Sequence, residues 1–124
     1  MDKTIVTILG VVFLAIGVLG FVNDPILSIF EVNGLHNVVH LVSGALALWA
    51  VSMGAGATKT FSKVFGVVYG LVAVLGFALP SLMTSLLDVN MADNILHIVL
   101  AVIFLYLGFG RGSSATPVSS LPPM

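Results

Sequence analysis

The stretch TIVTILGVVFLAIGVLGF, residues 4–21, decides the fold of this chain, because it contains no charged residue. A helix needs about 20 mostly apolar residues to cross the hydrocarbon core of a bilayer. Working outward from this stretch, four segments meet that requirement: residues 4–22, 35–53, 61–79 and 92–109. The sequence therefore predicts an all-α integral membrane protein that crosses the membrane four times.

The composition supports this prediction and excludes several functions. Of the 124 residues, 59% are hydrophobic and 7% are charged, and the mean hydropathy is +1.21. A water-soluble domain needs more charge than this to cover its surface. The net charge of −1 provides no means of neutralising phosphates, so we expect no nucleic-acid partner. Because cysteine is absent, disulfides, thiol nucleophiles, iron–sulfur clusters and covalently attached haem are excluded.

Charged residues flank the predicted spans with opposite signs at the two ends, and only Asp2 departs from this pattern. The basic residues are Lys3, Lys59, Lys63 and Arg111, and the acidic residues at the other end are Asp24, Glu31, Asp88 and Asp93. Basic loops stay in the cytoplasm. We therefore expect both termini and a loop at residues 54–60 to be cytoplasmic, with two acidic loops on the outer side.

The chain resembles itself when it is shifted by 56 residues. Residues 4–21 then align with TFSKVFGVVYGLVAVLGF, residues 60–77, and after a one-residue slip Asn37 pairs with Asn94 and His40 with His97. Polar matches inside apolar helices seldom arise by chance. We interpret the chain as two tandem two-helix repeats, about residues 4–54 and 60–110, that enter the membrane in the same direction. This pairing also predicts that residues 4–22 are a retained helix and not a signal peptide.

Packing and linker signals complete the expected fold. Small residues four apart, such as Gly66 and Gly70, let helices approach closely, so we expect one four-helix bundle over residues 1–110. The apolar outer connections predict short interfacial helices, the first starting at Asp24 and Pro25. The Ser/Pro-rich residues 111–124 predict a disordered cytoplasmic tail.

Two polar stripes stand out at the outer ends of the second and fourth spans. Their members are spaced by three and four residues, so each stripe occupies one helix face. If the faces meet, they form one shallow cluster near the outer surface. The first stripe is Asn33, His36, Asn37 and His40, and the second is Asn90, Asp93, Asn94 and His97.

Three interpretations of this cluster are open. In the first, it is structural, and the asparagines Asn33, Asn37, Asn90 and Asn94 hydrogen-bond between helices. In the second, it binds a cofactor. The metal ligands for Zn²⁺ or Cu²⁺ are then His36, His40, Asp93 and His97, or His40 and His97 are the axial ligands of haem b. In the third, it conducts ions or protons, although no charged residue continues inward from it.

The stretches EVNGLHNVVHLVSG, residues 31–44, and DVNMADNILHIVLAVIFLYLG, residues 88–108, resemble a family of small bacterial membrane proteins known as domain of unknown function 4383. The resemblance extends to about Gly110 and rests on the eight residues of the two stripes. The family's glycine after the second motif is Ala101 here, which still permits close packing. The resemblance implies a four-span protein of the bacterial inner membrane and implies no activity.

We expect a small polytopic membrane protein that is not an enzyme. Its expected role is that of an accessory or scaffold subunit in a larger membrane complex or a homo-oligomer, with a mainly structural Asn/His cluster. The alternative is a metal- or haem-binding membrane redox protein that uses His40 and His97.

Overall fold

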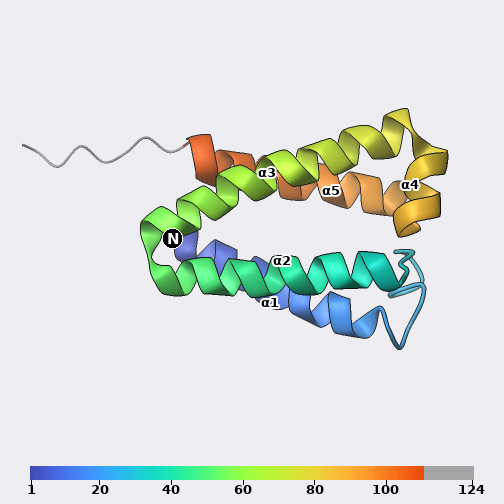
Figure 1. The fold of residues 1–124 in the computed structure, drawn as a ribbon, viewed down its shortest axis with the longest axis horizontal. Coiled ribbons are helices and arrows are strands. Elements are labelled where there is room, and N and C mark those ends of the chain that lie inside the picture. Colours follow the sequence, from blue (N-terminus) through green and yellow to red (C-terminus); the bar gives the residue numbers. More distant parts are fainter. Residues whose placement is uncertain (111–124) are drawn as a thin grey trace, which may run out of the picture.

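A computed structural model describes residues 1–110, and every regular element within them is a helix (Figure 1). In chain order the elements are α1 (Asp2–Leu19), α2 (Gly34–Met53), α3 (Ala55–Ala78), α4 (Pro80–Leu87), α5 (Met91–Leu105) and a π-helical turn (Tyr106–Gly110) that continues α5. The predicted all-α class is confirmed. The tail predicted at residues 111–124 lies outside the described residues.

Four of these helices are long and apolar enough to cross a membrane, as predicted. They are α1, α2, α3 and the continuous helix 91–110, with hydropathy values from 1.4 to 2.0. Even in the most enclosed of them, 91–110, only 44% of the most apolar window is buried inside the protein. Most of the apolar surface therefore faces outward, where a bilayer and not water is its natural solvent.

The four long helices pair as two hairpins, α1 with α2 and α3 with α5 (Figure 1). The hairpins join mainly through α2 against α3, and α1 also contacts α3. Figure 1 shows the start of the chain, the junction of α2 with α3 and the end of the helix after α5 at one end of the molecule. Residues 20–33 and α4 lie at the other end. We call these the turn end and the loop end.

The junction between the hairpins is the single residue Gly54, where the sequence predicted a loop over residues 54–60. Gly54 has φ 112° and ψ −177°, a conformation that is confined essentially to glycine. It reverses the chain so sharply that α3 begins at Ala55, directly after α2. The polar residues within 55–60 led to the prediction of a loop outside the membrane. Polarity, however, indicates depth in a bilayer and does not end a helix. The loop prediction was therefore wrong.

Only one of the two predicted outer helices forms. The second connection contains α4, which starts with Pro80 at its first position. The helix predicted after Asp24 is absent, because Leu27 and Ser28 have φ values of 52° and 60° that interrupt a right-handed helix. The backbone closes on itself instead, through hydrogen bonds of 2.8 and 3.1 Å between Ile26 and Phe30.

The middle of the bundle is filled by rings. Phe13 of α1 stacks on Tyr69 of α3, with ring centroids 5.4 Å apart, and Phe104 of α5 lies 6.4 Å from Phe13. Phe61 packs edge-on against Phe104 at 5.6 Å. We call Phe13, Phe61, Tyr69 and Phe104 the aromatic layer; all four are buried. It unites the two hairpins and separates the loop end of the interior from the turn end.

Candidate functional site

Two asparagines start the helices that carry the polar stripes. Asn33 precedes α2 in an extended conformation, and its side-chain oxygen accepts the backbone N–H of His36 at 2.9 Å. Asn90 does the same before α5, where it accepts the backbone N–H of Asp93 at 3.0 Å. An asparagine at this position satisfies a helix donor that would otherwise have no partner. The two caps therefore fix where each stripe begins.

The same asparagines also tie the two hairpins together at the loop end. Asn33 Nδ2 donates to the carbonyl of Leu86 in α4 at 3.0 Å. Asn90 Nδ2 donates to the carbonyl of Ile29, in the first connection, at 2.8 Å. Each hairpin thus provides the cap of its own helix and a backbone acceptor for the other hairpin.

The next asparagine of each stripe is buried against a glycine of the facing helix. The side-chain oxygen of Asn37 lies against Gly20, at the end of α1, and that of Asn94 lies against Gly76 in α3. A Cβ atom at either glycine would overlap this oxygen. The glycines therefore allow the stripes to face the interior of each hairpin.

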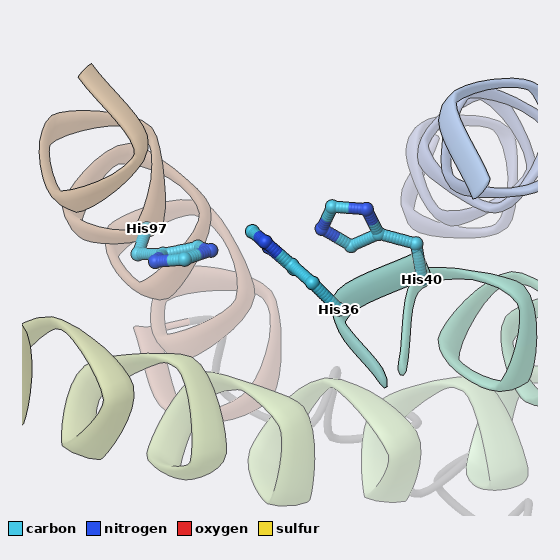
Figure 2. A group of neighbouring side chains, drawn as sticks. All are labelled: His36, His40 and His97. Carbon is cyan, nitrogen blue, oxygen red and sulfur yellow. The ribbon is translucent and has the colours of Figure 1, made fainter. Parts of the chain in front are cut away.

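Three histidines meet inside the loop end, and we call His36, His40 and His97 the histidine cluster (Figure 2). The ring centroids of His36 and His40 are 4.4 Å apart, and those of His36 and His97 are 5.8 Å apart. One potential ligand nitrogen from each ring lies within 4.8 Å of the others. Figure 2 shows the ring of His36 between the other two. The cluster thus combines the first hairpin, through α2, with the second, through α5.

The histidine cluster is buried and poorly satisfied. His36, His40 and His97 expose 1%, 4% and 2% of their surface. Among residues 1–110, the Nδ1 atoms of His40 and His97 are buried without a hydrogen-bond partner. The ring nitrogens of His36 form no hydrogen bond of standard geometry, although the backbone carbonyls of Leu87 and Glu31 lie beside that ring. A buried polar atom without a partner costs about 1–3 kcal/mol. Such groups call for an explanation, and an ion that accepts their lone pairs is one.

Asp93, the fourth metal ligand expected from the sequence, is not part of this group. Its carboxylate Oδ2 accepts the backbone N–H of Asn90 at 3.0 Å, which completes a capping box at the start of α5. Asp93 is also buried, with 2% of its surface exposed. The structure therefore reduces the candidate ligand set from four residues to three imidazoles.

The arrangement does not suit the haem interpretation, in which His40 and His97 bind one iron from opposite faces of a porphyrin. The ring of His36 contacts both of these histidines and lies between them, where the macrocycle would have to be (Figure 2). Two large grooves exist elsewhere on the described part of the chain. One is bounded by α3 and α5 and the other by α2 and α3, and neither is lined by a histidine.

Sequence reasoning missed the aromatic partners of the cluster. The Phe13 ring stacks on His40 with centroids 5.8 Å apart, and the Tyr69 ring lies 5.7 Å from His97. The Tyr69 hydroxyl donates to Ser43 Oγ at 3.0 Å. The signal was present, because Phe13 and Tyr69 occupy the same position in the two stretches that align at a shift of 56.

The family model described as domain of unknown function, DUF4383, matches residues 3–110 of this chain. The chain belongs to this family. The match confirms the family that the two polar motifs indicated, and it covers the whole histidine cluster. Searches of curated proteins and of solved structures found no match. The function of this DUF4383 protein therefore has to be argued from its own geometry.

Proposed function

We propose that this DUF4383 protein is a non-enzymatic, metal-binding membrane protein, with the histidine cluster as its site. The supporting observation is that three buried imidazoles from two hairpins converge, and that the Nδ1 atoms of His40 and His97 have no other partner. A metal held at about 2.0–2.1 Å by each of three imidazoles brings their nitrogens to roughly 3.4 Å from one another. They already lie within 4.8 Å, so the three side chains would have to move closer together to hold an ion.

The difference between the two stripes favours this function over a purely structural one. His36 and Asp93 each stand three residues after a capping asparagine. Asp93 closes the capping box of α5, whereas His36 forms no such bond and its ring lies beside the backbone carbonyls of Leu87 and Glu31. A carboxylate at position 36 would serve the cap better. A histidine at position 36 therefore leaves the α2 cap without the second bond that Asp93 provides in α5. It adds a third imidazole to the cluster instead.

We propose the finer architecture on the same grounds. The bonds from Asn33 to Leu86 and from Asn90 to Ile29 join residues that correspond at a shift of 57, which supports an internal duplication. Lys3, Lys59 and Lys63 lie toward the turn end, while the acidic connections are at the loop end. This supports a bacterial inner-membrane orientation in which the turn end is cytoplasmic.

The test is the metal content of the full chain. It should be purified in mild detergent through a tag without histidine, because the chain has only the three histidines of the cluster. After incubation with Zn²⁺ or reduced copper and removal of unbound ion, we expect one ion per chain by elemental analysis. His36→Ala, His40→Ala and His97→Ala should each abolish this binding, whereas Met91→Leu, an exposed control in α5, should not.

Unfolding measurements separate the metal-binding function from the structural one. If the cluster binds an ion, added metal raises the unfolding temperature of the native chain and has no such effect on the histidine variants. If the native chain binds none of these ions and the variants are merely less stable, the metal-binding function is wrong and the polar cluster is structural.

A second candidate function is that of an accessory or scaffold subunit, and one observation favours it. A groove of about 550 Å³ runs along α3 and α5, lined among others by Gly70, Ala73 and Ala101. Small residues of this kind let a transmembrane helix of another protein approach closely. Gly70→Trp should then release a membrane partner that co-purifies with the native chain. A second copy of this chain would be the partner if cross-linking yields only homo-oligomers.

A further inference from the structure

We propose that the ion bound by the histidine cluster is monovalent copper, Cu(I). This inference rests on the proposed metal-binding function and names the ion. It follows from three properties of the site: its donor atoms, the surroundings that a fourth ligand would need, and the charge that the protein offers to the ion.

The donor set consists of three imidazoles. Within residues 1–110, the group of potential ligand atoms contains no carboxylate, and the whole chain has no cysteine. Asp93 is held in its capping box by the backbone N–H of Asn90. Imidazole binds copper and zinc alike, so the donors select a borderline metal and exclude hard ions such as Mg²⁺ and Ca²⁺, which require oxygen. The other two properties decide between copper and zinc.

A three-histidine zinc site needs a fourth ligand, usually a water molecule, to complete its tetrahedron. The surroundings of the histidine cluster are poorly suited to that water. The Phe13 ring covers His40, and the Tyr69 ring packs beside His97. The Tyr69 hydroxyl donates its one proton to Ser43 Oγ, so it can offer such a water only an acceptor. Cu(I) is a closed-shell ion that is stable with two or three ligands, so it needs no water beside these two rings.

The charge of the ion also favours Cu(I) over Zn²⁺. Three neutral imidazoles compensate none of the charge of the ion, and the carboxylate that acts on the cluster from outside the ligand set is that of Asp88, beside His36. The cost of burying an ion grows with the square of its charge, so a divalent ion costs about four times as much as a monovalent one. Zinc and Cu²⁺ sites reduce this cost with carboxylate, thiolate or hydroxide, none of which the described cluster supplies. The monovalent ion is therefore favoured.

The experiment is a competition on the full chain in detergent, purified without a polyhistidine tag. Copper is kept reduced with ascorbate under argon, and bicinchoninate serves as the competing Cu(I) chelator. Zn²⁺ is titrated in parallel into separate samples, and then into the Cu(I)-loaded protein. We expect one Cu(I) per chain that an equal concentration of Zn²⁺ does not displace. The X-ray absorption edge should show a three-coordinate Cu(I) with nitrogen ligands.

One variant distinguishes the two ions directly. Methionine offers a soft thioether, which is a good ligand for Cu(I) and a poor one for zinc. His97→Met should therefore keep its Cu(I), with two imidazoles and one thioether, and lose any Zn²⁺ binding. His97→Ala should lose both. Met91→Leu and Met83→Leu, which remove the native methionines of α5 and α4, should change neither result.

The outcomes are separable. If Zn²⁺ binds to the native chain and displaces Cu(I), or if His97→Met loses Cu(I) while it keeps the native circular dichroism and elution volume, the assignment to Cu(I) is overturned and the metal site stands. If the native chain binds neither ion, both proposals fail. Should His97→Ala fail to fold, the competition on the native chain and the His97→Met variant still decide the question.

Discussion

At the scale of single residues, the two asparagines at the centre of the stripes, Asn37 and Asn94, depend on the absence of a side chain opposite them. Their oxygens lie against Gly20 and Gly76, and this contact sets how closely the helices of each hairpin approach at the loop end.

Replacing Gly76 with alanine should therefore be costly. The added Cβ would overlap the side-chain oxygen of Asn94 and lie 2.6 Å from its Cγ, so either the buried Asn94 side chain or the packing of α3 on α5 has to shift. Overpacking of this kind costs about 1–3 kcal/mol. Gly70→Ala, six residues earlier in the same helix, is the control, because its Cβ would meet only the Ala101 Cβ at 3.9 Å. Thermal unfolding in detergent measures both, and equal stability of the two variants would contradict this packing.

The sequence predicted which of the polar residues lie together, and their role as ligands stays a prediction. The alignment at a shift of 57 correctly brings His40 and His97 into one interior, and the spacing of the stripe adds His36. It also implied a role for Asp93 as a fourth ligand, because identical spacing cannot tell a side chain that caps a helix from one that faces the interior. Only the backbone geometry at Asn90 makes that distinction.

At the scale of secondary-structure elements, the differences between the predicted and the observed fold lie in the connections and not in the long helices. Hydropathy located all four spans, since each needs a long apolar stretch. It could not locate the start of α3 or the shape of residues 24–30, because these depend on backbone conformations at Gly54, Leu27 and Ser28. Conformations of this kind are set by local sterics and tertiary contacts, and hydropathy is insensitive to both.

The junction at Gly54 gives a sharp prediction at this scale. Gly54→Ala forces a side chain into a conformation that costs about 1–3 kcal/mol outside glycine, so the reversal between α2 and α3 should be strained. Gly56→Ala is the matched control, because this residue lies inside α3 and a Cβ there meets nothing within 4 Å. Alanine should stabilise the helix at that position. We expect a lower unfolding temperature for Gly54→Ala only; a loss for both variants would point to helix propensity and not to the turn.

At the scale of the whole molecule, the absence of cysteine makes the proposed orientation easy to test. Ser81→Cys places a thiol on the exposed surface of α4 at the loop end, and Ser52→Cys places one on the exposed surface of α2 near the turn end. In intact cells a membrane-impermeant maleimide should label position 81 and not position 52. Permeabilised cells, in which both positions react, are the control. Labelling of position 52 alone would reverse the orientation.

The pairing of helices into hairpins also belongs to this scale, and part of it was predictable. Short connections bring sequential apolar spans together, and the sequence shift indicates which residues of the two halves correspond. The aromatic layer was not predicted. A phenylalanine or tyrosine in an apolar helix gives no indication in the sequence of whether it faces lipid or its own partner.

The aromatic layer closes the histidine cluster on the side of the turn end. Phe13, Phe61, Tyr69 and Phe104 fill the interior on the turn side of the three imidazoles. An ion bound at the proposed site would therefore have to enter and leave on the loop side, so uptake and release would share one route. Such a site would suit storage of an ion, its exchange with a carrier or the sensing of its concentration on one face of the membrane better than its passage across.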